Sequence, residues 1–254
     1  MAGRAGADLV ATVKRAGIFV SGSGQPGAIL GIATDSRQVV AGGAFIAVRG
    51  SQQDGHQYAA QAVAAGAGLV VTDHPLGLGV PEVVVTDGRL AAIALARWWS
   101  GDPAAKLSLV GVTGTSGKTT TTLLIRHLFN EGGRAGSIGT LGAFDGLGRA
   151  IPSTAGSLTT PGPVDLMATL AGLVAAGVDR VAMETSSHSL DQGRLDDLKF
   201  DAGVFTNLSR EHLDYHRTMD DYRLAKLKLL DRLAPVVFLC QNNGYAISCP
   251  ADEQ

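Results

Sequence analysis

The sequence has little cysteine and no long hydrophobic run. Its two cysteines, Cys240 and Cys249, both stand in the last 15 residues, so a disulfide scaffold is excluded. No apolar run approaches the ~18 residues of a membrane helix. Residues 1–20 mix small, charged and apolar side chains, without the continuous apolar stretch of a secretory signal. We therefore expect a cytoplasmic protein that does not enter a membrane.

Charge is also scarce. Only 17% of the residues are charged and 45% are hydrophobic, which argues against a disordered chain or a coiled coil and predicts a packed core. The 21 basic and 23 acidic side chains leave a net charge of −2, so charge gives no support to nucleic-acid binding. A length of 254 residues suggests one or two domains.

Strand-like and helix-like segments alternate along the first hundred residues. Helices are predicted at 8–16, 58–65 and 89–99, and strands at 44–48, 68–72 and 83–86. This alternation is typical of βαβ units with a mostly parallel sheet. Gly101-Asp102-Pro103 interrupts the pattern, and we place a domain boundary there, so that the first α/β domain covers 1–103.

A second α/β series follows and is predicted as a domain over 104–235. Strands are expected at 107–112, 180–183 and 202–205, and helices at 118–130, 163–176 and 220–233. The fold class is therefore α/β, with a small N-terminal domain followed by a P-loop-type parallel-sheet domain.

A glycine-rich loop joins the first strand and helix of this second series. Residues 111–120 read GVTGTSGKTT. Glycines let backbone N–H groups turn toward phosphate oxygens, and the start of the helix favours an anion. Lys118 then suits the β- and γ-phosphates of a nucleotide, and the Thr119 hydroxyl suits Mg²⁺. Six positions before Lys118 the residue is Val112 rather than glycine, so the alternative is an ordinary strand-to-helix turn.

The loop GTSGKTTTT resembles that of the Mur ligase family of ATP-dependent, amide-forming ligases. The resemblance runs from about residue 33 to 235. It is strongest to the branch that adds the third stem-peptide residue to UDP-MurNAc-L-Ala-D-Glu in peptidoglycan synthesis. It implies ATP and Mg²⁺ as cofactors, and the UDP-MurNAc-dipeptide and an amino acid as substrates. The nucleotide would be bound by Gly114, Thr115, Ser116, Gly117, Lys118, Thr119 and Thr120.

The uridine nucleotide would be bound in the first domain. The turn Thr-Asp-Ser-Arg at 34–37 and the loop Gly-Ser-Gln-Gln-Asp-Gly at 50–55 resemble segments that border the family's UDP pocket. Short hydroxyls and amides suit uracil and phosphate oxygens. The alternative is a pair of ordinary polar loops. The resemblance implies contacts from Thr34, Ser36, Ser51, Gln52 and Gln53.

Two further motifs would bind the muramyl dipeptide. Leu158–Gly162 resembles the family's Thr-Thr-Pro loop, which implies substrate contacts from Thr159 and Thr160; the alternative for Thr160 is an N-cap of the following helix. Glu184 ends a predicted strand, where a carboxylate suits Mg²⁺. The resemblance adds substrate contacts from Ser186, Gln192 and Arg194, although Ser189 stands where the family often has glycine.

The stretch 206–216, TNLSREHLDYH, is the most specific resemblance, with Glu211 in place of the commoner aspartate. It implies that His212 is a metal or phosphate ligand. Lys226 matches the family's carbamylated lysine, which places an anionic oxygen near metal and γ-phosphate. The alternative is a solvated helix lysine, and Lys228 is a competing position. The implied metal ligands are therefore Thr119, Glu184, His212 and carbamylated Lys226.

The implied mechanism uses positioning and charge neutralisation rather than a protein nucleophile. A D-Glu carboxylate attacks the γ-phosphate of ATP to form an acyl phosphate, and the incoming amine then displaces phosphate. The catalytic residues would be Lys118, Glu184, His212 and Lys226. The remaining hypotheses are another Mur-type ligase, including one acting on folate, and a nucleotide-binding module without catalysis. A thiamine-diphosphate enzyme would lack nearly all of its required sequence. The acceptor, diaminopimelate or lysine, is not readable from these residues.

Residues 236–254 do not share the resemblance to the Mur ligase family. They resemble a short stretch of the thiamine-diphosphate-dependent 2-oxo acid dehydrogenase alpha subunit, but the matching Gly-Asp-Gly half is missing upstream. We therefore expect a junction near Pro235, with the family's third domain absent and little or no ligase activity from the chain alone.

Overall fold

The computed structural model describes residues 3–50, 53–152 and 158–233, so the resemblance noted for 236–254 lies outside the described residues. The described chain divides into two compact units, 3–102 and 103–233. None of the helices in these ranges combines the length and apolarity needed to span a bilayer.

The first unit is built on a five-stranded sheet in the order β2-β7-β6-β5-β4. The strands are β2 (Phe19–Ser23), β4 (Ile32–Ala33), β5 (Ala44–Ile46), β6 (Leu69–Thr72) and β7 (Glu82–Val85). All neighbours pair in parallel except β2, which is antiparallel to β7. A small ribbon pairs β1 (Arg4–Ala5) with β3 (Ala28–Ile29). The glycine-rich segment 17–31 therefore contains strands that the hydrophobic pattern did not predict.

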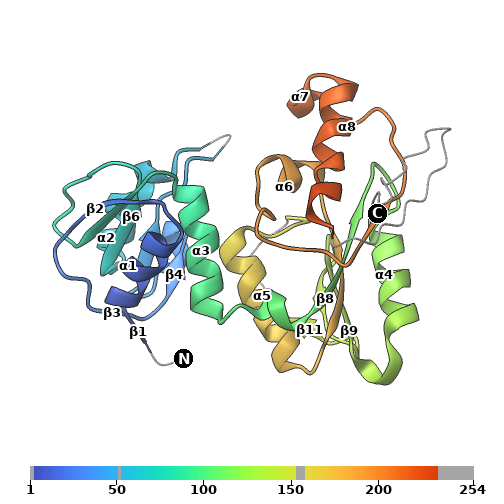
Figure 1. Ribbon diagram of the computed structural model, residues 1–254, viewed down its shortest axis with the longest axis horizontal. Coiled ribbons are helices and arrows are strands. Elements are labelled where there is room, and N and C mark those ends of the chain that lie inside the picture. The colour runs from blue at the N-terminus through green and yellow to red at the C-terminus, as the bar shows by residue number, and fades with distance from the viewer. Residues whose placement is uncertain (1–2, 51–52, 153–157, 234–254) are drawn as a thin grey trace, which may run out of the picture. The chain divides into compact units, whose positions relative to one another are not determined.

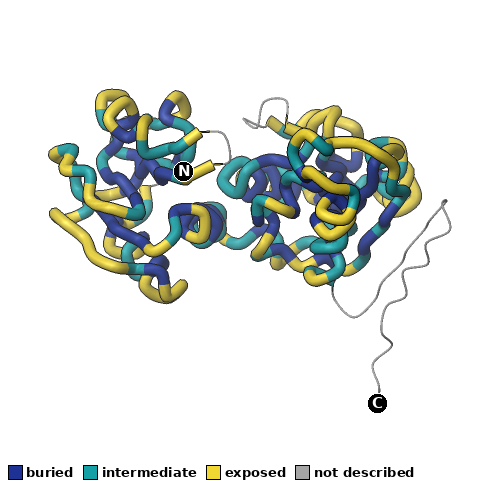
Figure 2. Tube along the Cα trace, turned by 90° about the horizontal axis from the view of Figure 1, so that it is seen from above, coloured by how far each residue is buried: buried dark blue, intermediate teal, exposed yellow. Residues whose placement is uncertain are grey.

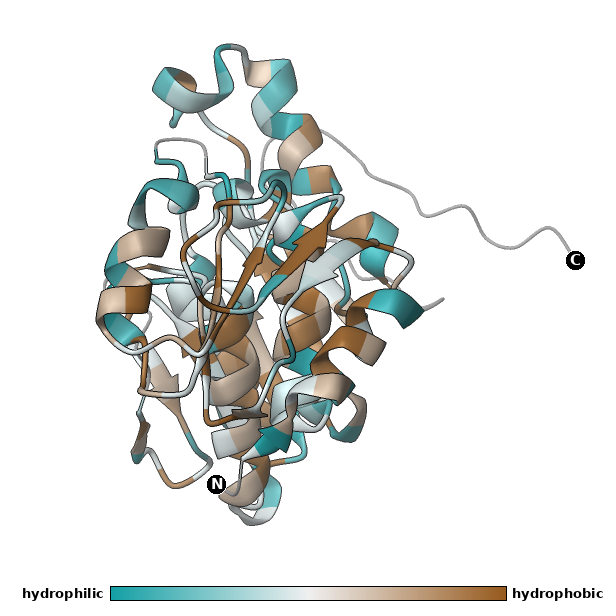
Figure 3. Cartoon of the chain, turned by 90° about the vertical axis from the view of Figure 1, so that its left-hand side faces the viewer, coloured by the Kyte–Doolittle hydropathy of each residue, from teal (hydrophilic) through white to brown (hydrophobic). Residues whose placement is uncertain are grey.

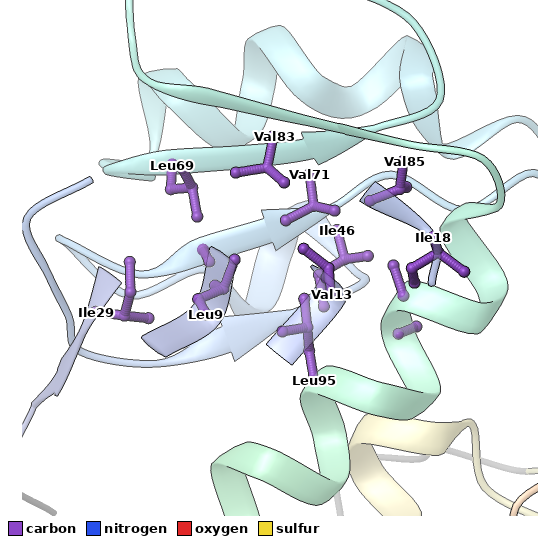
Figure 4. Packing of buried hydrophobic residues seen from close by; sticks show 13 residues of the cluster. Leu9, Val13, Ile18, Ile29, Ile46, Leu69, Val71, Val83, Val85 and Leu95 are labelled. Atoms are coloured by element: carbon purple, nitrogen blue, oxygen red, sulfur yellow. The ribbon is translucent and has the colours of Figure 1, made fainter. Parts of the chain in front are cut away.

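Helices cover both faces of this sheet (Figure 1). Ile46 and Val71 pack with Leu9 and Val13 of α1 (Gly6–Arg15) and with Leu95 of α3 (Gly88–Ser100), as Figure 4 shows. The adjacent residues Phe45 and Val70 pack instead with two alanines of α2 (Ala59–Ala64). Successive strand residues point to opposite faces, so a strand buried on both sides must be apolar throughout. That is why β5 and β6 are buried along their length. Figure 2 shows such buried segments in the interior and exposed segments around them.

The second unit has a six-stranded sheet in the order β11-β10-β9-β12-β8-β13. Strands β8 (Ser108–Thr113), β9 (Ala135–Gly139), β12 (Arg180–Glu184) and β13 (Ala202–Phe205) are parallel, while β10 (Gly142–Phe144) and β11 (Ala150–Ile151) are antiparallel additions at one edge. Figure 3 shows strands coloured mainly as hydrophobic in the middle of the view. The prediction of α/β units with mostly parallel sheets is confirmed, although β9, β10 and β11 were not predicted.

The helices of the second unit are α4 (Lys118–Phe129), α5 (Pro163–Ala175), α6 (Ser187–Asp191), α7 (Leu213–His216) and α8 (Met219–Leu227). Ala135 faces a small apolar pocket with Ile125 of α4, whereas a side chain on the next residue, Gly136, would meet Leu173 of α5. The two helices thus cover opposite faces of the sheet. The helix predicted at 220–233 was too long: α8 ends at Leu227, and a short 3₁₀ turn follows at Leu230–Arg232.

Three parallel strands end at the same edge of this sheet. Thr113 ends β8, Glu184 ends the neighbouring β12, and Phe205 ends β13 on the other side of β8. The segments that follow these strands carry most of the second-domain residues singled out by the sequence. Ligands of open parallel sheets bind at this edge.

Candidate active site

The loop between β8 and α4 has the backbone of a phosphate-binding turn. Gly114 has φ 142° and Gly117 has φ 83°, conformations that L side chains rarely adopt. A Cβ on Gly114 would lie 2.0 Å from the Thr206 hydroxyl oxygen, so glycine is required there by close approach as well. Gly117 is the N-cap of α4, and no side chain caps the helix. The first N–H groups of α4 therefore face a site suited to an anion.

The segment after β13 holds this loop in place. The Thr206 hydroxyl and the Asn207 side-chain amide both donate to the Ser116 carbonyl, at 2.6 and 3.0 Å. The Asn207 amide oxygen accepts from the Ser116 N–H at 3.0 Å. Thr115 is buried, and its hydroxyl oxygen accepts from the Ser209 N–H at 2.9 Å. The loop is thus fixed by contacts more than 90 residues away in sequence.

Two lysines meet at one carbonyl of the loop. Lys118 Nζ donates to the carbonyl oxygens of Gly114 at 3.0 Å and Thr115 at 2.9 Å. Lys226 Nζ donates to the same Gly114 oxygen at 2.7 Å. Burial lowers the pKa of Lys118, while Glu184 and Glu211 act in the opposite direction. Burial and the neighbouring Lys118 charge lower the pKa of Lys226 to about 7.

Lys226 and Lys228 differ sharply in surroundings. Lys226 is 1% exposed, and its ammonium lies 4.3 Å from the centroid of the buried Tyr222 ring. Lys228 has 40% of its side chain exposed and pairs with Asp191 at 2.7 Å. A solvated helix lysine is therefore a correct description of Lys228 and a wrong one of Lys226. A pKa of about 7 leaves a substantial share of the Lys226 amine unprotonated at neutral pH.

Glu184 is 1% exposed at the end of β12. Its two carboxylate oxygens accept from the Thr140 N–H at 3.0 Å and the Thr140 hydroxyl at 3.2 Å. A side chain on Gly139 would overlap this carboxylate, so glycine leaves the space that it occupies. Thr140, which directly follows β9, thus orients the Glu184 carboxylate. The negative charge of Glu184 favours the ammonium form of Lys118.

Thr160, Ser186, Gln192 and Arg194 form a connected polar group. The Thr160 hydroxyl donates to the Glu184 carbonyl at 3.0 Å and accepts from the Ser186 N–H at 3.1 Å. Arg194 donates to the Thr160 carbonyl at 3.2 Å and to the Gln192 side-chain oxygen at 2.5 Å. The N-cap of α5 is Gly162, so the alternative of Thr160 as that cap is wrong. The Thr159 hydroxyl lies 3.2 Å from the Thr140 hydroxyl and extends this group.

His212 lies in a cluster of aromatic rings beside this group. It has φ 55° and precedes α7, and its ring meets that of His188 edge-on at 4.9 Å. His188 also lies 4.3 Å from Tyr215 and 5.5 Å from His216, and the Tyr222 ring packs 5.2 Å from His216. Burial lowers the pKa of both His188 and His216.

The loop also has the chemistry to take a nucleotide with its metal ion. Thr119 stands in the first turn of α4 and is partly exposed. Among the described residues, the hydroxyl oxygens of Thr113 and Thr185 are buried without a hydrogen-bond partner at the ends of β8 and β12. Hydroxyls and a carboxylate are hard oxygen donors, which suit Mg²⁺. The donor set therefore fits a metal–nucleotide complex.

The first unit has its own pocket, with a volume of about 620 Å³. The predicted residues Thr34, Ser36 and Gln53 line it, whereas Ser51 and Gln52 lie outside the described residues. The Ser36 hydroxyl donates to the side-chain oxygen of Gln61, which also lines the pocket. The sequence analysis did not single out Gln61 in the first unit, nor Thr140 and Tyr222 in the second. Tyr222 stands four residues before Lys226 on α8, and this helical spacing was an available signal.

Comparisons with known proteins agree with this arrangement. Residues 112–248 match the Mur ligase middle domain, and residues 28–93 match a domain described as "Mur ligase family, catalytic domain". The UDP-N-acetylmuramoyl-L-alanyl-D-glutamate--2,6-diaminopimelate ligase of Geobacillus thermodenitrificans is 44% identical over 218 residues, which cover 85% of this chain and 44% of that one. The ligase of the same description from Ectopseudomonas mendocina is 48% identical over 203 residues, covering 77% and 40%.

Solved structures show the same fold. A structure of a UDP-N-acetylmuramoyl-L-alanyl-D-glutamate--2,6-diaminopimelate ligase has a TM-score of 0.67 and 29% identity, and the match covers 85% of this chain and 44% of that chain. MurF from Acinetobacter baumannii has a TM-score of 0.65 and 20% identity, covering 95% and 50%. The chain thus spans less than half the length of the curated relatives named above.

Proposed function

This chain belongs to the Mur ligase family, and on that premise we propose that it carries the nucleotide and UDP-substrate sites of an ATP-dependent ligase. The reaction would join 2,6-diaminopimelate, the amino acid in the names of its relatives, to UDP-MurNAc-L-Ala-D-Glu in cytoplasmic peptidoglycan synthesis. The observation that carries this proposal is the meeting of Lys118 and Lys226 at the Gly114 carbonyl.

In the proposed reaction, a D-Glu carboxylate oxygen attacks the γ-phosphorus of ATP and ADP leaves. The amine of the amino acid then attacks the acyl carbon, and phosphate leaves. Both steps concentrate negative charge on phosphate oxygens, so catalysis requires positioned positive charge and N–H donors. Lys118 supplies the positive charge, and the first N–H groups of α4 supply the donors. The loop that carries them is fixed by hydrogen bonds to Asn207 and through Thr115.

A bound Mg²⁺ would supply charge neutralisation at the β- and γ-phosphates. The residues that would hold it are Thr119, Glu184, His212 and carbamylated Lys226. The role of Lys226 depends on its neutral amine, since only the unprotonated form takes up CO₂. The muramyl dipeptide would contact Thr159, Thr160, Ser186, Gln192 and Arg194. The uridine diphosphate would enter the pocket lined by Thr34, Ser36 and Gln53, with Ser51 and Gln52 in the same loop.

The experiment is a pair of assays on the whole chain. Isothermal titration measures ATP binding in the presence of Mg²⁺, and hydroxylamine trapping detects acyl phosphate formed from UDP-MurNAc-L-Ala-D-Glu and ATP without any amino acid. Lys118→Met should abolish ATP binding, whereas Lys106→Met, an exposed lysine in the same unit, should not change it. Binding of ATP that survives Lys118→Met would refute the assignment of the loop. ATP binding without turnover, even when a separate third Mur domain is supplied, would favour a nucleotide-binding module.

A further inference from the structure

A cluster of histidine and aspartate side chains lies in the first unit. His56 belongs to the 3₁₀ turn before α2, and Asp73 and His74 directly follow β6. One ligand atom from each of the three side chains lies within 4.8 Å of the other two. His56 Nε2 is 3.1 Å from an Asp73 carboxylate oxygen, and His74 Nδ1 contacts the same oxygen.

The hydrogen bonds of His56 identify its tautomer. Nδ1 lies 2.5 Å from the Asp54 carboxylate. An ionised carboxylate only accepts, so Nδ1 carries the hydrogen. In the neutral ring the lone pair then lies on Nε2, where it accepts from the Asp73 N–H at 3.4 Å. Nε2 also lies 3.1 Å from an Asp73 carboxylate oxygen, a gap that a proton on Nε2 bridges in the charged ring and that a metal ion can bridge in its place.

We propose that His56, Asp73 and His74 bind a divalent transition-metal ion of the zinc class, through His56 Nε2, His74 Nδ1 and a carboxylate oxygen of Asp73. Zinc takes imidazole nitrogen and carboxylate oxygen at about 2.0–2.2 Å in a tetrahedron. Such bonds set neighbouring ligand atoms roughly 3.3 Å apart, close to the 3.1 Å between His56 and Asp73. Two imidazoles with one carboxylate favour zinc over Mg²⁺ or Ca²⁺.

The surroundings of the site agree with this donor set. Asp54 holds the far nitrogen of His56, and metal-binding histidines commonly have such a carboxylate partner. The His56 side chain is only 7% exposed, which fixes its ring, whereas the His74 side chain is 51% exposed and leaves an entry from solvent. The fourth position of the metal would be filled by water from that side.

One side chain competes with the metal. The Arg49 guanidinium lies 3.4 Å from Asp54 and 3.3 Å from Asp73, so it neutralises part of the charge that would attract a cation. Removing this charge should tighten metal binding. A variant that gains affinity is informative, because misfolding would not produce a gain.

The metal would tie the loop before α2 to the end of β6. Gly50, Gln53 and Gly55 of that loop line the 620 Å³ pocket, so the ion would stiffen one wall of it. This role is separate from the nucleotide loop of the second unit, and its failure would leave the proposed ligase function untouched.

The test is a zinc titration of the whole chain carrying Cys240→Ser and Cys249→Ser, which removes both thiols. Long-range ¹H–¹⁵N spectra report each imidazole ring. One equivalent of Zn²⁺ should shift the ring nitrogens of His56 and His74, and leave those of His127, an exposed histidine on α4, unchanged. Mg²⁺ at the same concentration should shift neither. Shifts confined to His188, His212 and His216, or a His56 ring that carries protons on both nitrogens at saturating zinc, would overturn the proposal.

Variants sharpen this test. His56→Gln and the more exposed His74→Gln should each abolish the one-equivalent response, and His127→Gln should preserve it. Asp54→Asn should weaken zinc binding about 10- to 100-fold, as expected for loss of a partner behind a metal-binding histidine. Arg49→Gln should tighten it. Unchanged zinc affinity in both Asp54→Asn and Arg49→Gln would show that zinc binds elsewhere.

Discussion

The buried amine of Lys226 makes the stability of the second unit depend on pH in a predictable direction. Its pKa falls from 10.5 to about 7 because burial disfavours the charged form. In the unfolded chain the amine stays protonated up to about pH 10.5, so between these two values the unfolded state binds the extra proton. Stability therefore rises with pH across this window.

The magnitude follows from the same pair of pKa values. A pKa difference of one corresponds to about 1.4 kcal/mol. The decrease of about 3.5 for Lys226 thus corresponds to a cost on the order of 5 kcal/mol below pH 7, and this cost is relieved as pH rises toward 10.5. In Lys226→Met the cost is absent at every pH. The variant should therefore be more stable than the wild type near pH 6 and lose most of that advantage by pH 10.

Urea unfolding followed by far-UV circular dichroism measures this difference at a series of pH values. Trp98 and Trp99 both lie in the first unit, so their fluorescence separates its transition from that of the second unit. The buffers must be free of CO₂, because a carbamate would replace the amine. The control is Lys228→Met, since Lys228 is half-exposed and paired with Asp191. If the pH profiles of Lys226→Met and Lys228→Met coincide, the reasoning is wrong.

Three further predictions concern the same unit. Gly114→Ala should lower the unfolding free energy of the second unit by about 3 kcal/mol or more, because backbone strain of about 1–3 kcal/mol adds to the overlap with Thr206. Gly117→Ala, where the added carbon has free space around it, should cost about 1–2 kcal/mol in the same urea experiment. Equal losses in the two variants would contradict the role of the Thr206 overlap. Tyr222→Phe removes the hydroxyl that lies 3.2 Å from the Thr115 hydroxyl. The variant should lose about 0.5–1.5 kcal/mol of unfolding free energy and bind ATP more weakly in a titration. If stability and ATP affinity are both unaltered, this contact does not support the loop. Burial lowers the pKa of His188 and His216, so the unfolded chain binds more protons than the folded one as pH falls through about 6.5, and stability should decline there. His188→Asn should reduce this decline in thermal melts recorded at a series of pH values. An identical acid profile in the variant and the wild type would refute the prediction.

The sequence predicted the parts of the fold that depend on local pattern. The apolar run at 107–112, the glycines after it and the Lys-Thr pair are consecutive, so strand, loop and helix could be placed without any distant contact. The same holds for β5, β6 and α3. The weak points were short edge strands such as β10 and β11, whose residues carry little periodic signal, and the end of α8.

The site itself required tertiary structure. Lys226 and Lys228 both stand in or next to the last turn of α8, and only the packing of that helix against the Gly114 loop buries one and leaves the other in solvent. Thr140 reaches Glu184 because β9 lies beside β12, an order that no local pattern contains. The cluster of His56 with Asp73 and His74 likewise follows from the position of β6 next to β5. The sequence by itself therefore determined the types of the site residues and the short spacings between them. Burial, pKa and the meeting of distant side chains were decided by strand order, because desolvation and charge coupling act through space rather than along the chain.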